Sequence, residues 1–503
     1  MLSSGPMAAR ASRAASRPGN EGIQLLWPGR RWRMDGAPDG PQADRSPQSG
    51  PGTATRLFDV TPPKEYGADG ASGAVQRLVH GDVLDVTDAL VREGLRGKVD
   101  LVYVDPPYAS DRDYVAESRL DGPADGRVVR THAYEDTWTS RAGGLGAYLD
   151  MLAPRLEALA DLLGPKGSIW VHVDWRASYL VRAILDEVLG RDAFLNEIVW
   201  RRAPNLGRQA TSGQFGRTLD TLVVYGKPDA TLTPPTRLEP IEESSIRRDD
   251  EGRPFTSAPR GDYTDASIEK LDKIGRVHRT ASGRVYIKYF LVKNEEGVLC
   301  RERRVDALWT DVPPLRHAAA SERTGYPTQK PRALLERIIT CATPPGGIVV
   351  DAFGGSGTTA VAANALGRRA VLGDRSPVAI ATARARLLRD GASVRIERAR
   401  GAVAAPLATA SVDTAVTPSG VAITLTLPEE PMAWAVGTCA DDVFTCLWHT
   451  ERGLGGKAIA AENSTIVRSA VAADPNLRVR VWGDDGSMTT IPVAMPPRKG
   501  SRA

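Results

Sequence analysis

Short apolar runs that alternate with helical segments constrain this chain more than any other feature. The runs KVDLVYV (Lys98–Val104) and SIWVHV (Ser168–Val173) lack the polar alternation of a strand that has one face in water. Two other segments, Tyr148–Leu163 and Tyr179–Leu189, carry apolar residues at helical spacing. Buried strands that alternate with helices predict an α/β fold with a doubly wound, mostly parallel sheet.

Changes in composition divide the chain into four regions. Residues 1–55 are rich in Gly, Pro, Ser, Ala and Arg, which predicts a disordered basic tail. The α/β pattern occupies 56–227 and returns at 326–395. Between these two parts, 228–325 is dense in turn residues and has strand character, so we expect a β-rich insertion there. In 396–503 helical spacing is lost and Asp-Gly turns appear, which predicts a small β domain.

The charge of the chain is nearly balanced overall but uneven along it. There are 65 Lys and Arg against 61 Asp and Glu, a formal net charge of +4 over 503 residues. This excludes a polybasic, histone-like protein and permits an enzyme with one basic face. Segment 270–304 holds ten Lys or Arg against four acids, a local charge of +6.

Cysteine and histidine are sparse and scattered. The four cysteines form no C-x-x-C pair and the six histidines stand alone, so we expect neither a disulfide framework nor a metal site. No apolar stretch reaches the roughly 18 residues of a membrane helix. These observations favour a reducing, cytoplasmic setting.

The first candidate site is the motif Asp105-Pro106-Pro107-Tyr108, which directly follows a buried strand. Open α/β sheets bind ligands at the carboxyl ends of their strands. Two consecutive prolines make the turn rigid and leave carbonyls free to accept hydrogen bonds, and tyrosine offers a flat face. Carboxylate, carbonyl and aromatic ring together suit a planar ring that bears an amino group. An ordinary proline-rich turn is the alternative interpretation.

The second candidate site is a glycine-rich turn, D-A-F-G-G-S-G-T at Asp351–Thr358, between a predicted strand and a predicted helix. Such a turn lets the backbone approach a ligand at a helix N-terminus. Asp374 ends the next strand, 19 residues after Gly355, where an acid can bind ribose hydroxyls. The pattern indicates an adenosine-containing cofactor, either a nicotinamide dinucleotide or S-adenosylmethionine. Helix–strand packing is the alternative role for these glycines.

The order of the motifs resembles one family. Gly81-Asp82, D-P-P-Y, a variable basic region, P-T-Q-K-P at Pro327–Pro331 and D-x-F-x-G-S-G-T occur in this order. Over residues 75–395 the chain resembles site-specific adenine DNA methyltransferases of the permuted β class, above all the modification subunits of type III restriction systems. Three departures from the family pattern are Ala352, where many members have proline, Gly373, which places glycine beside Asp374, and Ala109–Asp111, where many have an asparagine-containing turn.

This resemblance implies a Rossmann-like methyltransferase sheet, S-adenosylmethionine as cofactor and a set of site residues. Asp105 and the Pro106 carbonyl would accept the two hydrogens of the target amino group, and Tyr108 would stack on the flipped base; Pro107 completes the catalytic motif. The cofactor-binding residues would be Asp82, Gln329, Lys330, Asp351, Phe353, Gly354, Gly355, Gly357, Thr358 and Asp374. The region 228–325 would recognise the target, and the candidate DNA contacts are Arg201, Arg202, Lys288, Arg301, Arg303 and Arg304.

The implied partners are double-stranded DNA, a second copy of the chain and a restriction or helicase subunit, in a bacterial restriction–modification or phage-defence setting. Three other functions remain open. The family's cytosine-N4 enzymes more often carry serine where Asp105 stands, which favours adenine. A nicotinamide-dependent oxidoreductase fits Gly355-x-Gly357-x-x-Ala360 but leaves D-P-P-Y without a role. A non-catalytic DNA-binding subunit does not require the intact Asp105 and Tyr108.

Overall fold

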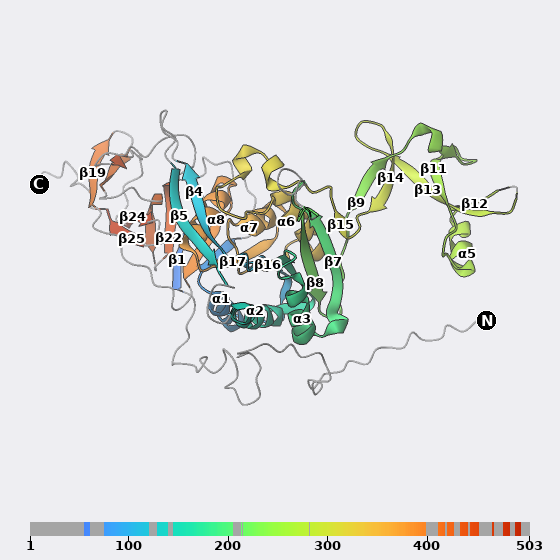
Figure 1. Cartoon of the computed structure of the whole chain (residues 1–503). Coiled ribbons are helices and arrows are strands. Elements are labelled where there is room, and N and C mark those ends of the chain that lie inside the picture. Colours follow the sequence, from blue (N-terminus) through green and yellow to red (C-terminus); the bar gives the residue numbers. More distant parts are fainter. Residues whose placement is uncertain are drawn as a thin grey trace, which may run out of the picture.

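A computed structural model of the chain describes residues 55–60, 75–119, 128–138, 144–204, 213, 215–280 and 282–398, and a set of strands between 411 and 493 (Figure 1). The predicted disordered tail lies outside the described residues except for Thr55. The predicted α/β class with a mostly parallel sheet is confirmed. The predicted domain boundaries stay a prediction.

The centre of the molecule is a ten-stranded sheet in the order β1-β18-β2-β17-β16-β3-β6-β8-β7-β15. Only β1 and β8 run antiparallel to their neighbours; the other pairs are parallel. The strands are β1 (Thr55–Val60), β2 (Gln76–His80), β3 (Val99–Val104), β6 (Leu163–Val173), β7 (Phe194–Arg201), β8 (Leu219–Gly226), β15 (Leu308–Trp309), β16 (Ile348–Asp351), β17 (Arg369–Asp374) and β18 (Val394–Arg398).

Helices cover both faces of this sheet (Figure 1). One layer is α1 (Val83–Arg92), α2 (Gly144–Asp161) and α3 (Ser178–Leu189), and the other is α6 (Arg332–Ala342), α7 (Thr358–Ala365) and α8 (Pro377–Arg389). Along β3, Val102 and Val104 pack in the hydrophobic cluster that includes α1–α3, whereas Leu101 and Tyr103 pack in the cluster that includes α6–α8. Alternate residues therefore enter two cores, which explains the unbroken apolar run.

The strand order brings the two candidate motifs together. β16 pairs in parallel with β3, with Asp351 opposite Tyr103. Asp105 follows β3 and the glycine-rich turn follows β16, so both lie at the carboxyl edge of the sheet. Segments about 250 residues apart in the chain thus form one site.

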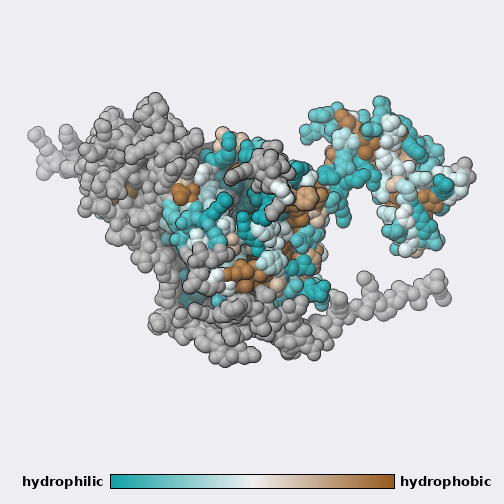
Figure 2. All heavy atoms as spheres, in the orientation of Figure 1, coloured by the Kyte–Doolittle hydropathy of each residue, from teal (hydrophilic) through white to brown (hydrophobic). Residues whose placement is uncertain are grey.

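Two smaller elements extend from the sheet. A hairpin of β4 (Arg112–Arg119) and β5 (Val128–Asp136) follows the D-P-P-Y turn. Residues after β8 form a six-stranded lobe that stands away from the body (Figure 1) and has a mostly hydrophilic surface (Figure 2). The lobe contains β9 (Thr236–Pro240), β10 (Arg247–Arg248), β11 (Pro254–Pro259), α5 (Asp265–Lys273), β12 (Val277–Arg279), β13 (Val285–Lys293) and β14 (Leu299–Arg304).

The remaining elements are short 3-10 turns and the C-terminal strands. The 3-10 turns are Arg191–Ala193, Glu243–Ser245, Leu315–His317 and Ala320–Glu322. The C-terminal strands are β19 (Ser411–Thr417), β20 (Gly420–Thr426), β21 (Ala433–Ala440), β22 (Val443–Glu451), β23 (Thr465–Ile466), β24 (Leu477–Trp482) and β25 (Met488–Pro492), in a three-stranded and a four-stranded sheet. Among the described helices, none has the length and apolar character needed to cross a bilayer.

Gly357 marks a close contact between α7 and α8. It precedes α7 with φ +81°, and a Cβ atom there would lie 2.5 Å from the Cβ and 2.7 Å from the Cα of Ala383 on α8. We expect Gly357→Ala to lower the free energy of unfolding by about 2–4 kcal/mol, through backbone strain and overpacking. Gly367→Ala is the matched control, since Gly367 has a similar φ of +69° and open space around it; we expect it to cost about 1 kcal/mol. Equal losses in urea denaturation would contradict this packing argument.

Candidate active site

A single pocket at the carboxyl edge of the sheet collects the predicted site residues. Its walls come from the D-P-P-Y turn, the β4–β5 hairpin, the P-T-Q-K-P segment, the glycine-rich turn and the end of β17. The lining includes Asp82, Asp105, Pro106, Pro107, Tyr108, Gln329, Lys330, Asp351, Phe353, Gly354, Gly355, Thr358 and Asp374. Of the predicted catalytic and cofactor residues, only Gly357 is not part of the lining.

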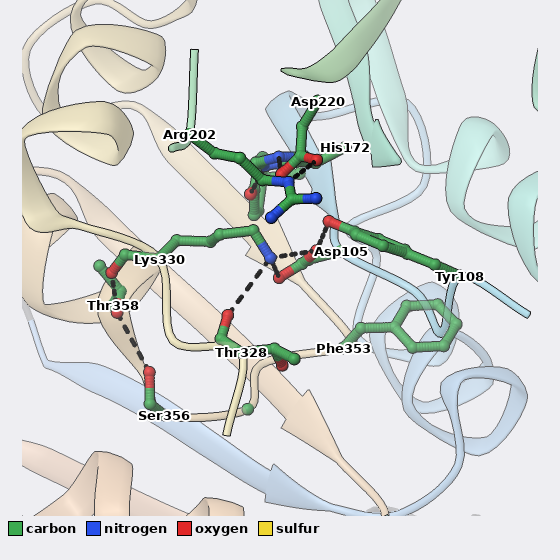
Figure 3. Close-up of polar contacts among 12 residues, drawn as sticks. Asp105, Tyr108, His172, Arg202, Asp220, Thr328, Lys330, Phe353, Ser356 and Thr358 are labelled. Atoms are coloured by element: carbon green, nitrogen blue, oxygen red, sulfur yellow. Dashed lines mark hydrogen bonds and ion pairs between the residues drawn. The ribbon is translucent and has the colours of Figure 1, made fainter. Parts of the chain in front are cut away.

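Asp105 is held by two side chains of the pocket, Lys330 and Tyr108 (Figure 3). The Lys330 ammonium donates to its two oxygens at 2.8 and 2.6 Å, and the Tyr108 hydroxyl donates to Oδ1 at 2.7 Å. Lys330 Nζ also lies 5.3 Å from the centre of the Tyr108 ring. Lys330 is predicted to lie near the cofactor. In the structure its ammonium contacts the predicted catalytic acid, Asp105, and lies beside the Tyr108 ring.

The D-P-P-Y turn is held by a residue that sequence reasoning missed. Asp136, the last residue of β5, accepts hydrogen bonds from three successive backbone N–H groups, those of Tyr108, Ala109 and Ser110, at 2.9–3.1 Å. Burial raises the pKa of Asp136 above its ordinary value, although these hydrogen bonds act against the shift. The Tyr148 hydroxyl donates to the Pro107 carbonyl at 2.9 Å. The Pro107 carbonyl therefore already has a hydrogen-bond donor within the protein.

Two buried carboxylates form the other half of the pocket. Asp351 accepts hydrogen bonds from the Thr359 hydroxyl and the backbone N–H of Phe353. Asp374 accepts from the backbone N–H groups of Gly355 and Ser376 at 2.8 and 2.7 Å. Burial raises the pKa of Asp351 to about 7 and that of Asp374 to about 6. The negative charge of Asp105 adds to the shift at Asp351.

These features define what the second half of the pocket can hold. At Gly354 a Cβ atom would come within 2.2 Å of the Leu372 side chain, so only glycine lets the turn lie this close to β17. At Asp351 and Asp374 the effect of burial on the pKa outweighs that of the hydrogen bonds they accept, so a positive charge brought by a ligand would favour their ionised forms. A ligand that brings hydroxyl groups and a positive charge fits this half of the pocket.

Three other predicted cofactor residues also serve the protein itself. Asp82 caps α1 through the backbone N–H of Leu84 and forms an ion pair with Arg155 at 2.7 Å. Gln329 is buried, and its side chain hydrogen-bonds within the segment that precedes it. Thr358 donates to the Lys330 carbonyl at 3.1 Å. These contacts tie the walls of the pocket together.

Sequence reasoning also missed a set of buried, hydrogen-bonded polar residues behind Tyr108. His172 on β6 is fully buried; its Nδ1 lies 2.9 Å from the Tyr103 hydroxyl and its Nε2 lies 3.3 Å from Asp220. Arg202 donates to Asp220 at 2.7 Å (Figure 3). Burial acts to raise the pKa of Asp220, but His172, Lys330 and Arg202 together hold it below the ordinary value. Arg202, predicted to bind DNA, is therefore hydrogen-bonded to Asp220 within this set of buried polar residues.

The other predicted DNA contacts fall in two places. Arg201 is exposed at the end of β7. Lys288, Arg301, Arg303 and Arg304 lie on β13 and β14 in the lobe. There the guanidinium of Arg301 lies 3.6 Å from the centre of the Tyr289 ring, and Arg303 pairs with Glu239 at 2.7 Å. None of these residues lines the pocket.

One group of residues on the hairpin could hold a metal ion. Asp113, His132 and Glu135 place their ligand atoms within 4.8 Å of one another, and all three are exposed. Exposed acidic groups commonly stand this close without an ion. The absence of a metal site remains a prediction.

Comparison with known proteins gives one family. Residues 99–385 match the DNA methylase family. The chain is 28% identical over 320 residues to the type II methyltransferase M.EcaI of Enterobacter cloacae, covering 58% of this chain and 65% of that protein. It is 25% identical over 342 residues to the Mod subunit of the type III restriction-modification enzyme StyLTI of Salmonella typhimurium, covering 57% and 49%. These matches span less than two thirds of either relative.

The chain also resembles a DNA adenine methyltransferase over a short stretch and aligns with a solved structure. Over 91 residues the chain is 41% identical to the DNA adenine methyltransferase YhdJ of Escherichia coli, covering 18% of this chain and 30% of that protein. The crystal structure of the M1.HpyAVI–SAM complex aligns with a TM-score of 0.35 at 18% identity, covering 62% of this chain and 98% of that one.

The pKa of Asp351 makes stability depend on pH. Between about pH 4 and 7 the folded chain holds a proton on Asp351 that the unfolded chain, with an ordinary carboxyl pKa, has released. Stability therefore falls as pH rises through this window, and Asp374 contributes in the same direction up to about pH 6. We expect Asp351→Asn to remove on the order of 1–3 kcal/mol of the difference between pH 4.5 and 7.5, measured by urea denaturation. An unchanged pH dependence in this variant would contradict the assignment.

Proposed function

Because the chain belongs to the DNA methylase family, which matches more than half of it, we propose that it transfers a methyl group from S-adenosylmethionine to the 6-amino group of adenine in a specific DNA sequence. The observation that carries this proposal is the pairing of β3 with β16. It brings the Asp105 carboxylate into one pocket with the glycine-rich turn and Asp351, which supports a role for Asp105 as acceptor for the target amino group. A transferase needs donor and acceptor sites in direct contact.

The second half of the pocket fits the cofactor. S-adenosylmethionine supplies, when bound, a methyl group on a positively charged sulfur. Asp374 would accept hydrogen bonds from the ribose hydroxyls, and Asp351 with Phe353–Gly357 would hold the methionine end. A cationic ligand suits carboxylates whose pKa values burial has raised, because its charge favours their ionised form.

The D-P-P-Y turn would prepare the amine for attack. An exocyclic amino nitrogen conjugated with its ring is a poor nucleophile. Asp105 would accept one amino hydrogen and the Pro106 carbonyl the other, which favours a pyramidal nitrogen with its lone pair directed away from both acceptors. Tyr108, fixed by its hydrogen bond to Asp105, would stack on the flipped base. Aspartate at position 105 favours adenine over cytosine as the target.

Lys330 would hold Asp105 in place during this step. A carboxylate offers about four lone-pair positions, so Asp105 can keep the ammonium and still accept from the target amine. The bond from Thr358 to the Lys330 carbonyl joins this lysine to the first residue of α7. Lys330 thus acts as a positioning residue between the two halves of the pocket.

The lobe would recognise the target sequence, and the chain would act together with partners. The lobe carries Lys288, Arg301, Arg303 and Arg304 on adjacent strands, which supports target recognition through phosphate and groove contacts. The similarity to a type III Mod subunit supports a restriction subunit as partner in the bacterial cytoplasm. We also propose that the chain forms a homodimer.

Asp105→Asn tests the proposed chemistry. We expect it to reduce transfer of labelled methyl groups to unmodified, amplified genomic DNA by about 100-fold or more, since a charged acceptor is lost at the reacting nitrogen. Cofactor binding, measured by calorimetry, should change little. Asp113→Asn, an exposed acid on the neighbouring hairpin, is the matched control and should transfer normally. Full activity in Asp105→Asn would refute the assignment, and no transfer by the wild-type chain would refute the function.

Lys330→Met tests the positioning role. We expect kcat to fall roughly 10- to 100-fold because the carboxylate loses its main fixed donor. KM for DNA should not rise, because Asp105 has lone-pair positions free for the target amine whether or not the ammonium is present. Lys330→Arg should recover most of kcat. A loss that lies entirely in KM, or no loss at all, would contradict this role.

A further inference from the structure

Four exposed apolar side chains lie on segments that meet at the carboxyl edge of the sheet, beyond the pocket. Trp175 follows β6 and is 47% exposed, and Tyr179 in the first turn of α3 is 61% exposed. Leu219 at the start of β8 is 45% exposed, and Phe215, just before it, is fully exposed. β6 runs parallel to β3 and β8 runs antiparallel to both, so the end of β6 and the start of β8 share the edge that carries Asp105.

Two arginines lie against the Trp175 ring. The guanidinium of Arg217 lies 4.0 Å from the centre of the Trp175 ring, and that of Arg176 lies 5.1 Å from it. Arg176 is itself held by an ion pair with Asp174, and Arg201 is exposed at the end of the nearby strand β7. We name as the Trp175 patch the residues Trp175, Arg176, Tyr179, Arg201, Phe215, Arg217 and Leu219.

The charge of this surface is positive. Two acids on these strand ends, Asp174 and Asp220, are each 3% exposed and paired with Arg176 and Arg202. The exposed side chains of the patch therefore offer aromatic rings and guanidinium groups rather than carboxylates.

The patch lies next to the target side of the pocket. His172, three residues before Trp175 on β6, has its ring 6.3 Å from that of Tyr108. β6, β8 and β7 lie on one side of β3, and the cofactor strands β16 and β17 lie on the other. No residue of the patch lines the pocket itself, so the patch is a separate surface adjoining the place of the flipped base.

Aromatic rings next to arginines match the chemistry of unpaired nucleotides. Bases stack on exposed aromatic rings regardless of sequence, and guanidinium groups bind phosphates and stack as well. This inference rests on the proposed function. When a target base is extruded from the duplex, the base that was paired with it and the adjacent bases lose stacking contacts. We propose that the Trp175 patch binds an unpaired nucleotide of the DNA beside the target base, with Trp175 stacking on the base and Arg217 and Arg201 contacting phosphates.

Binding of a fluorescein-labelled thymine oligonucleotide of about 20 nucleotides, followed by anisotropy, tests this proposal. We expect Trp175→Ala to weaken binding about tenfold or more, from the loss of one stacking contact. Trp175→Phe should retain most of the affinity. Val75→Ala is the matched control, because Val75 is 44% exposed at the opposite, amino edge of the same sheet. It should bind as the wild type does.

Two further measurements make the outcome decisive. For a fully paired duplex, Trp175→Ala should lower the affinity of the protein by less than about threefold, because stacking requires an unpaired base. Cofactor binding should be unchanged in each variant, which excludes misfolding. Equal binding of the oligonucleotide by wild type and Trp175→Ala, or no binding by the wild type, would overturn the proposal. If methyl transfer to DNA still occurs in that case, the proposed function stands and only the role of the patch fails.

Discussion

The parallel pairing of β16 with β3 is the constraint on which the rest of the site depends. With Asp351 opposite Tyr103, the glycine-rich turn emerges beside the D-P-P-Y turn. Asp374 on β17, the next strand, joins them in the same pocket. Three carboxylates thus converge at one edge of the sheet, and the charges of Asp105 and Asp374 both raise the pKa of Asp351. The site is negative before any ligand binds, and a cationic methyl donor relieves that charge.

The protein balances this charge unevenly between the two halves of the pocket. Asp105 has the Lys330 ammonium at 2.6 Å, whereas Asp351 and Asp374 rely on a hydroxyl and on backbone N–H groups. The target half is therefore neutralised in advance, and the cofactor half is left for a ligand to neutralise. The contact between Thr358 and the Lys330 carbonyl joins the two halves.

The alternating strands and helices, the D-P-P-Y turn and the turn at Asp351–Thr358 could be predicted from the sequence, because apolar runs and glycine-rich or proline-rich turns are local signals. Asp82, Gln329 and Lys330 could be predicted only through the family resemblance. Contacts across the fold could not be predicted. Asp136 lies on a hairpin strand with no motif of its own, and the pairing of His172 with Asp220 depends on the antiparallel register of β6 and β8. The partner of Lys330 is 225 residues away in the chain. A local pattern also misled: helical spacing continues to Leu163, but α2 ends at Asp161 and Leu163 already belongs to β6.

The identity of the methylated nucleoside tests the central claim most directly. Unmodified DNA is incubated with the chain and isotopically labelled S-adenosylmethionine, digested to nucleosides and separated by chromatography with mass detection. The arrangement of Asp105, Pro106 and Tyr108 beside the glycine-rich turn predicts label in N6-methyldeoxyadenosine, and about 100-fold less or lower when Asp105 is replaced by asparagine. Label in N4-methyldeoxycytidine, or no labelled nucleoside from a chain that binds the cofactor, would contradict it.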